Sequence, residues 1–355
     1  MKLFIFANGE DLETNGCDYH RVLLVARALH IYARDLIHVT LKPVIETLDV
    51  VFHNLFYFSR HVPLTKEQLD MFKRLISQRP FVYDLDDNML EILPENVLPY
   101  HFWKANQQNF LYVLEHANIL CSPNEELIKF YNSAINQDKP YVVLPNMVDT
   151  AFAVDHPTIT EPIRIFWQGG SSHVSDLKII SNVMHELPNV VSKKIEYVTM
   201  GPAREFMLAN LFGGQEPQVR WEHYGWLRCS DYYYFIRSLK VHLGIAPLQN
   251  NRFSNCKSIL KVLDYVYAGA LPVMSKVKPY DGCLETLSDE ELDKIFIENN
   301  DEQKWIENLK FLCENDEFRA NLFRKIRKEL FEKYNPRTVA RKFATDLRLQ
   351  YQKIK

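Results

Sequence analysis

Glycine is scarce in this sequence. The chain has 11 glycines among 355 residues, which is about 3% and under half of the ~7% found in average proteins. Collagen-like and glycine-rich low-complexity chains are therefore excluded. We expect each glycine that remains to meet a specific need of the backbone, because glycine is otherwise costly to order.

Cysteine is sparse too, and its spacing shows no pattern. The six cysteines lie far apart, and no two of them form a Cys-x-x-Cys pair. A zinc site or a disulfide framework would show closer and more regular spacing. We expect buried, reduced thiols at all six positions, which are Cys17, Cys121, Cys229, Cys256, Cys283 and Cys313.

Long hydrophobic runs are missing. No stretch of 18 apolar residues occurs, although a membrane-spanning helix needs about that length. The apolar stretch within residues 1–8 is too short for the core of a signal peptide. We therefore expect a cytoplasmic protein that spans no membrane. The hydrophobic fraction of 47% and the charged fraction of 25% are those of a soluble globular chain.

Charge is balanced over the whole chain and unbalanced near its C-terminal end. The formal net charge is −3, but residues 319–355 carry twelve Lys or Arg against three acidic residues. One interpretation is the solvent face of two amphipathic helices that are separated near Pro336. The other is a basic surface for an anionic partner such as DNA, lipid head groups or a phosphorylated glycan. Both stay open.

Short apolar runs alternate with longer amphipathic stretches, as in parallel sheets with helices on both faces. The chain is more than twice the ~150 residues of a typical domain, which favours two domains. The segment 146–162 lacks helical periodicity and predicts a linker. The expected strands are 3–7, 48–53, 81–84, 118–122 and 141–144, then 163–168, 195–200, 219–222, 241–247 and 271–275, with helices in the first half near 19–33, 65–77, 100–115 and 123–135.

This pattern predicts an α/β chain with two Rossmann-like, doubly wound domains at residues 1–150 and 151–335, followed by a basic helix at 336–355. Ligands of open parallel sheets bind at the carboxyl ends of the strands. Residues that directly follow each strand are therefore the first candidates for a functional site.

The first candidate motif follows the strand 163–168. Gly169, Gly170 and Ser171 precede His173, and a helical pattern opens near Asp176. Exposed amides at such a turn suit an anion such as phosphate. A tight turn with a structural histidine explains the same residues equally simply.

The second candidate motif is a polar stripe. At 100° per residue, Lys257, Lys261 and Asp264 fall within about 60° of one another on a predicted helix. Two ammonium groups one turn apart can meet the charge of a diphosphate, and a carboxylate can accept hydrogen bonds from sugar hydroxyls. The alternative is the solvated side of an amphipathic helix.

These motifs together resemble the nucleotide-sugar signature of GT-B glycosyltransferases of the family 4 type. The resemblance covers roughly residues 1–335 and is most specific over 245–280. The residues that carry it are Ile245 to Leu248, Phe253, Asn255, Lys257, Ser258, Lys261, Asp264, Tyr265, Gly269, Pro272, Val273, Pro279 and Tyr280, with Trp167 to Gly169, His173, Asp176 and Leu177, Leu144 to Asn146, and Gly16, Tyr19 and Arg21.

The resemblance implies two Rossmann-like domains facing a central cleft, with the acceptor on the first domain and the nucleotide sugar on the second. It also implies that the basic helix 336–355 crosses back to the first domain. In the donor site it implies Lys257 and Ser258 on the diphosphate, and Gly169, Gly170 and Ser171 as the phosphate loop of the second domain with His173 beside it. Gly16 then belongs to the corresponding loop of the first domain.

Two positions depart from the family pattern. Asp264 stands where the family has a glutamate that binds the donor ribose. The other glutamate of the family pair, which addresses the donor sugar, is replaced by Cys256. We therefore expect donor binding at Asp264 with an altered ribose contact, and the identity of the sugar stays open.

A third motif contains clustered aspartates. Asp84 and Asp86 have the Asp-x-Asp spacing that binds manganese in a different glycosyltransferase fold, GT-A, and Asp87 follows. GT-B enzymes stabilise the leaving diphosphate with amides, helix dipoles and lysines instead, so we expect no metal. In the family this strand end faces the acceptor, and Asp86 and Asp87 are candidates to orient or deprotonate an attacking hydroxyl. A helix N-cap cluster is the alternative.

The resemblance therefore implies a retaining, metal-independent hexosyl- or pentosyltransferase that uses a UDP- or GDP-linked sugar as co-substrate and no cofactor. Asp86, Asp87, Lys257 and Lys261 are its expected catalytic residues. The expected acceptor is a glycan or a lipid-linked glycan, and peripheral membrane contact through the basic helix stays open. Hydroxymethylated DNA, as in phage enzymes, and a non-catalytic nucleotide-sugar-binding protein are the alternatives.

Overall fold

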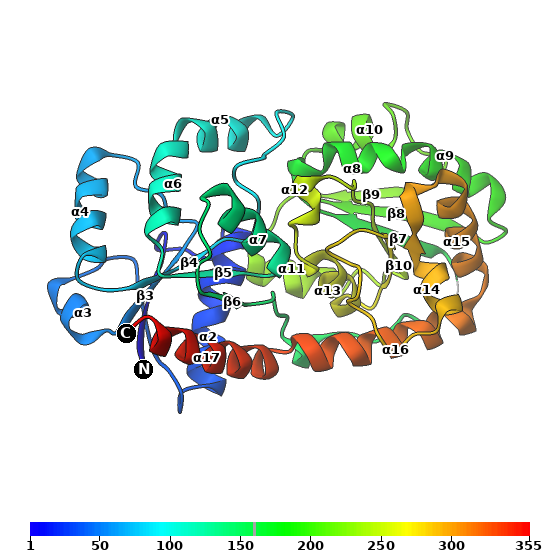
Figure 1. Ribbon diagram of the computed structural model, residues 1–355. Helices are drawn as coiled ribbons and strands as arrows, with labels where there is room; N and C mark the ends of the chain where they lie inside the picture. Colours follow the sequence, from blue (N-terminus) through cyan, green and yellow to red (C-terminus); the bar gives the residue numbers. More distant parts are fainter. Residues whose placement is uncertain (159–160) are drawn as a thin grey trace. The chain divides into compact units, whose positions relative to one another are not determined.

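The computed structural model describes residues 1–158 and 161–355 and divides into two compact units. The first unit contains Met1–Met147, Cys256–Ser258 and Tyr334–Lys355, and the second contains Val148–Asn255 and Ile259–Lys333. Each unit is built on a six-stranded sheet (Figure 1). The predicted α/β class with two doubly wound sheets is confirmed.

The first unit has a parallel sheet in the order β2-β1-β3-β4-β5-β6. The central β3 reads Leu-Phe-Tyr-Phe-Ser and is buried along its whole length, as expected for a strand covered on both faces. The strands are β1 (Lys2–Phe6), β2 (His38–Lys42), β3 (Leu55–Ser59), β4 (Phe81–Asp84), β5 (Ile119–Ser122) and β6 (Tyr141–Val143), and the helices are α1 (Gly16–Asp18), a π-helical turn (Tyr19–Leu23), α2 (Leu24–Tyr32), α3 (Thr47–Phe52), α4 (Lys66–Ile76), α5 (Val97–Ala105), α6 (Gln107–His116), α7 (Glu125–Ala134) and α17 (Pro336–Lys353).

The second unit has a parallel sheet in the order β12-β11-β10-β7-β8-β9. Its strands are β7 (Ile163–Gln168), β8 (Ile195–Met200), β9 (Trp221–Tyr224), β10 (Leu243–Ala246), β11 (Leu271–Ser275) and β12 (Phe296–Ile297), its α-helices are α8 (Val174–Ile179), α9 (Ser181–Val190), α10 (Arg204–Leu211), α11 (Cys229–Ile236), α12 (Arg252–Asn255), α13 (Leu260–Tyr267), α14 (Asp289–Ile295), α15 (Glu302–Glu314) and α16 (Asp316–Tyr334), and its 3-10 turns are Thr150–Phe152, Ser171–His173 and Glu298–Asn300.

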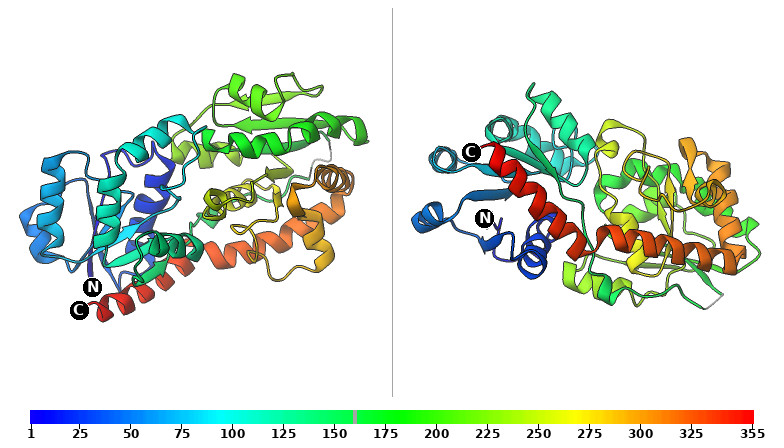
Figure 2. Two further views of the ribbon diagram at one scale, coloured as in Figure 1. Left: turned by 45° about the horizontal axis from the view of Figure 1, so that its top comes forward. Right: turned by 60° about the horizontal axis from the view of Figure 1, so that its bottom comes forward.

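The last helix, α17, packs on the first unit. It contacts α2 and β6, and Figure 2 shows it in red beside the blue N-terminal elements. Its buried residues recur every three or four positions, so they form one apolar stripe. Each large member contributes about 1.5–3 kcal/mol by burial. The stripe consists of Val339, Ala340, Phe343, Ala344 and Leu347, and all five belong to the core of the first unit.

Several basic side chains of the tail have acidic partners. In the first unit, Arg341 donates to both carboxylate oxygens of Asp35 at 3.1 and 3.2 Å, and Lys342 donates to Asp346 at 2.6 Å. These contacts favour the interpretation of an amphipathic packing helix with a charged outer side. No helix in the described part of the chain is long and apolar enough to cross a membrane.

One predicted strand is wrong. Residues 48–52 lie in the helix α3, which has a capping box between Glu46 and Asp49 at its N-terminus, and His53 is the C-cap of this helix. The apolar run was ambiguous, because a short run fits a strand or a helix. The run forms a helix in the structure. In this helix Leu48, Val51 and Phe52 are exposed. The strands β2 and β3 lie on either side of it in sequence and were not predicted.

Two expectations from composition need correction. Glycine is required at Gly244, where a Cβ atom would lie 2.3 Å from the ring of Tyr265, but the space around Gly9 and Gly225 is open. Among the cysteines, Cys17 and Cys229 are half-buried rather than buried. The other four are buried as expected.

Candidate functional site

The loop after β7 brings backbone and side chains into close contact within the second unit. A Cβ atom on Gly169 would lie 2.7 Å from Nζ of Lys261 and 3.0 Å from the ring of His173. A Cβ atom on Gly201, which follows β8, would lie 2.2 Å from the carbonyl oxygen of Gly169. Packing therefore requires glycine at Gly201, where backbone stands in the way, whereas the nearest atom to Gly169 is the end of the flexible Lys261 side chain. Both residues leave bare backbone at the carboxyl edge of the sheet.

Lys261 reaches this loop from the first turn of α13. Its side chain is almost buried, with 7% of the residue exposed. Nζ donates a hydrogen bond to the carbonyl oxygen of Gln168 and lies 4.7 Å from the ring centre of Trp167. A buried ammonium group therefore lies beside the Gly169 loop.

The residues that follow Gly169 continue the same edge. Gly170 precedes a 3-10 turn that begins at Ser171 and ends at His173, and α8 begins at Val174. Nδ1 of His173 lies 2.7 Å from the carboxylate of Asp176, which also accepts a hydrogen bond from the backbone of Gln249 at 2.8 Å. The imidazole therefore has a fixed orientation beside the loop.

Asp264 lies on α13 one turn after Lys261 and is only 3% exposed. Its carboxylate accepts hydrogen bonds from Tyr233 at 2.7 Å, Tyr232 at 3.0 Å and Gln168 at 3.1 Å. Burial raises the pKa of Asp264 to about 7, although the two tyrosine hydroxyls lower it. The predicted solvated stripe is wrong at this position, since Asp264 and Lys261 are buried polar residues.

No sequence motif indicates Tyr232 and Tyr233. Both lie on α11, about 30 residues before Asp264, and no motif spacing connects them to it. A pair of tyrosines in an amphipathic helix was the only available signal.

Lys257 and Ser258 do not share a helix with Lys261. The helix α13 begins at Leu260, and residues 256–258 group with the first unit. Oγ of Ser258 accepts a hydrogen bond from Asn146 at 2.9 Å, and Asn124 donates to the carbonyl groups of residues 256 and 257 at 3.0 and 2.9 Å. The predicted continuous stripe is wrong, because α13 begins only at Leu260, after the segment whose carbonyl groups the Asn124 side chain binds.

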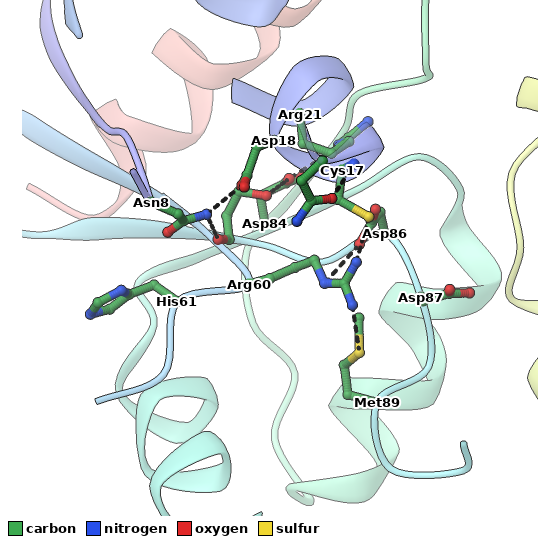
Figure 3. A network of polar contacts seen from close by, with 12 residues as sticks. Asn8, Cys17, Asp18, Arg21, Arg60, His61, Asp84, Asp86, Asp87 and Met89 are labelled. Carbon is green, nitrogen blue, oxygen red and sulfur yellow. Dashed lines mark hydrogen bonds and ion pairs between the residues drawn. The ribbon is translucent and has the colours of Figure 1, made fainter. Parts of the chain in front are cut away.

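A second group of candidate residues lies at the carboxyl edge of the first sheet (Figure 3). Asp84 ends β4 and is fully buried. It accepts two hydrogen bonds from Arg21, at 3.0 and 2.5 Å, and one from Ser59 at 2.9 Å. The Asp-x-Asp metal interpretation fails for Asp84, because its carboxylate is already bound by these donors.

Asp86 and Asp87 follow β4 in a segment without helix. The next helix begins at Val97, so the N-cap interpretation of the aspartates is wrong. Oδ1 of Asp86 lies 3.4 Å from Nε of Arg60, and Oδ1 of Asp87 lies 3.4 Å from Nζ of Lys257. The two predicted acceptor-side carboxylates thus each face a cation, and Lys257 joins this edge of the first unit.

Two further points concern the same edge. Gly16 begins α1, where Asn15 accepts a hydrogen bond from the backbone of Cys17 at 2.9 Å. A Cβ atom at Gly16 would meet no atom within 4 Å, so packing does not require glycine there. Its role in donor binding stays a prediction. In the described parts of the chain, no three His, Cys, Asp or Glu side chains are grouped as a metal site would need.

Comparisons of the sequence and the structure with known proteins identify the fold. No protein-family model matches the chain, and no curated protein matches it in sequence. HepE of Anabaena in complex with UDP matches in structure at 12% identity and a TM-score of 0.61, covering 98% of this chain and 99% of HepE. An alpha-glucosyltransferase, AGT, in complex with UDP matches at 11% identity and 0.61, covering 99% and 98%.

Sucrose-phosphate synthase from Thermosynechococcus elongatus matches at 10% identity and a TM-score of 0.64, covering 100% of this chain and 99% of the synthase. Identities this low establish a shared architecture and no more. The two parallel six-stranded sheets and the match along the whole chain agree with the resemblance read from the motifs. The chain therefore has the GT-B fold of these glycosyltransferase structures.

Proposed function

We propose that this protein is a retaining glycosyltransferase that moves a sugar from a UDP- or GDP-linked donor to an acceptor hydroxyl without a metal ion. A glycan or a lipid-linked glycan is the proposed acceptor. The observation that carries the proposal is the buried ammonium group of Lys261 beside the Gly169 loop, at the carboxyl edge of a parallel sheet.

The chemistry of the leaving group explains why this arrangement matters. When the bond between sugar and diphosphate breaks, negative charge develops on the diphosphate, and groups already aimed at it lower the barrier. Lys261 supplies a cation in a setting where burial strengthens electrostatic interactions. Gly169 and Gly170 let a phosphate approach the backbone closely, because neither residue carries a side chain of its own.

The donor class is supported by the fold neighbours, two of which were solved with UDP bound. The remaining donor residues are proposed on the family resemblance, with Ser171 and His173 at the loop and Lys257, Ser258, Asp264 and Gly16 as further donor contacts. Asp264 already accepts three hydrogen bonds. A ribose hydroxyl would therefore use its remaining acceptor capacity or displace a tyrosine.

On the acceptor side, Asp86 and Asp87 are the proposed catalytic carboxylates. Both follow β4 at the carboxyl edge of the first sheet, where the family places its acceptor. An ionised carboxylate there can accept a hydrogen bond from the attacking hydroxyl and orient it. Metal independence follows in this proposal from the lysines, which supply the positive charge that a metal would otherwise bring.

The test is transfer and hydrolysis of radiolabelled UDP- and GDP-sugars by the wild-type chain, Lys261→Ala and Lys328→Ala. Lys328 is an exposed lysine on α16 of the same unit and serves as the matched control. We expect turnover by wild type and control, and a loss of about 10²-fold or more in Lys261→Ala. Turnover that is unchanged in Lys261→Ala contradicts the assignment. Tight donor binding without any turnover contradicts an enzyme and supports the non-catalytic alternative.

A further inference from the structure

Arg60 occupies an unusual backbone position at the acceptor-side edge. It directly follows β3 and has a φ of 51°, in the left-handed region that residues other than glycine rarely adopt. Its backbone N–H donates to the carbonyl oxygen of Asp84 at 2.9 Å, which anchors this conformation to the end of β4. Strained residues of this kind concentrate at functional sites.

The guanidinium group of Arg60 has a poor set of partners. Two of them are sulfur atoms, Sγ of Cys17 and Sδ of Met89, the latter at 3.6 Å. Sulfur is a weak acceptor. The ring centre of Trp103 lies 5.7 Å away. Among the described residues, Asp86 alone brings a carboxylate within ion-pair distance of Arg60, at 3.4 Å (Figure 3).

Asp86 also has few partners. Its side chain is 13% exposed, and Oδ1 is buried without a hydrogen-bond partner in the described chain. An ionised carboxylate in such a place is costly unless a cation compensates for the lost water. Burial would raise the pKa of Asp86, but Arg60 opposes this most strongly, and the net shift is downward.

We propose that Arg60 is a positioning residue, which holds the carboxylate of Asp86 as an anion in one orientation so that it can accept a hydrogen bond from the acceptor hydroxyl. The inference rests on the proposed function for the role of Asp86. Arg60 thereby becomes a residue of the proposed acceptor site that no sequence motif indicates. Its positioning role also explains its strained backbone conformation.

Other groups facing Asp86 do not replace Arg60. The charge of Arg21 also lowers the pKa of Asp86, but its guanidinium is hydrogen-bonded to Asp84. Burial lowers the pKa of His20 to about 3, so this imidazole is neutral near pH 7. Cys17 lowers the pKa of Asp86 through a hydrogen bond, whereas Asp18 and the adjacent Asp87 contribute like charge nearby.

The experiment compares Arg60→Gln, Arg60→Lys, Asp86→Asn and Arg74→Gln in the full chain. Arg74 is an exposed arginine on α4 of the same unit and is the matched control. The first readout is a carbon NMR titration of labelled aspartate carboxyl groups without donor, in which the Asp86 signal is assigned by its loss in Asp86→Asn. The second is the acid limb of the pH dependence of sugar transfer.

We expect Arg60→Gln to raise the pKa of Asp86 by about 1–3 units, because an opposite charge at this range lowers a carboxyl pKa by that amount. Arg60→Lys should give a smaller rise, since it keeps the charge without the planar fork. Arg74→Gln should match wild type. The acid limb of transfer should move with the NMR value. This second readout separates positioning from a merely structural role.

The outcomes are distinguishable. An Asp86 pKa that stays in place in Arg60→Gln overturns the inference, as does a shifted pKa with an unmoved acid limb in an active enzyme. If the wild-type chain transfers no sugar but the pKa of Asp86 moves as expected, the pairing stands and the proposed function fails. If Arg60→Gln does not fold, Arg60→Lys tests the same shift, and no change there overturns the inference.

Discussion

Arg21 and Asp84 form a bidentate ion pair inside the first unit, with both side chains almost completely buried. The remaining donors of Arg21 reach the carbonyl oxygen of Leu144 at 2.6 Å and the side chain of Asn146 at 3.0 Å. Asn146 in turn donates to Ser258. One buried arginine therefore links the ends of β4 and β6 to the short segment at residues 256–258.

Breaking this pair should destabilise the protein strongly. We expect Asp84→Asn to lower the free energy of unfolding by about 3–5 kcal/mol, because it leaves the charge of Arg21 buried without its partner. Urea denaturation at neutral pH measures this effect. A loss below about 0.5 kcal/mol, the range of ordinary surface substitutions, would show that the pair is not the anchor described.

The double variant Arg21→Met with Asp84→Leu provides the complementary test. Removing both charges leaves no unpaired ion, so the double variant should be less destabilised than the sum of the two single variants. The same denaturation series gives this coupling. Simple additivity would contradict a direct interaction between the two side chains.

The buried carboxyl group of Asp264 predicts a pH dependence of stability. Its pKa is about 7 in the folded chain and 3.8 as the ordinary value, so the folded state binds the proton more tightly. Stability should therefore fall as the pH rises from about 4 to 7, and the loss is complete above the folded pKa. In Asp264→Asn this component should be absent. Urea denaturation at pH 5 and pH 8 measures this change in the free energy of unfolding. The same change in both proteins would contradict the raised pKa.

Gly169→Ala should separate folding from function. The new methyl group would stand 2.7 Å from Nζ of Lys261, at the end of a flexible side chain that can move aside. We expect a small change in stability and a loss of sugar transfer of about tenfold or more, because the ammonium leaves its place. Gly225→Ala is the control, since its surroundings are open. Full transfer by Gly169→Ala would argue against the loop as a phosphate site.

The stereochemistry and metal requirement can be read in one assay. Proton NMR of the first product should show the anomeric configuration of the donor, and transfer should persist in excess EDTA. An inverted anomer would exclude the retaining proposal. Activity that EDTA abolishes and manganese restores would exclude the metal-independent one.

The sheets could be predicted from the sequence because strands that are buried on both faces read as continuous apolar runs. The bounds of β4, β7, β8 and β11 match the prediction, whereas β3 was missed although it reads Leu-Phe-Tyr-Phe-Ser and is buried along its whole length. The apolar run at residues 48–53 does not predict its element, since its length and composition fit either a strand or a helix.

The site could be predicted only where the motif is local. Gly169 and His173 lie within five residues of each other, and the structure brings them together. Arg60 and Asp86 are paired by the parallel alignment of β3 with β4, which no local pattern encodes. The start of α13 at Leu260 is not encoded locally either, since Asn124, 132 residues earlier, binds the carbonyl group of Cys256 just before the helix.

Calorimetric titration of the wild-type chain and Lys261→Ala with UDP and GDP tests the central claim most directly. The claim predicts that wild type binds one of the two nucleotides and that Lys261→Ala binds it about tenfold or more weakly, because a charge-assisted contact of about 1.5–3 kcal/mol is lost. Lys328→Ala should bind like wild type. Equal affinity in Lys261→Ala, or no binding of either nucleotide by the wild-type chain, would contradict the account.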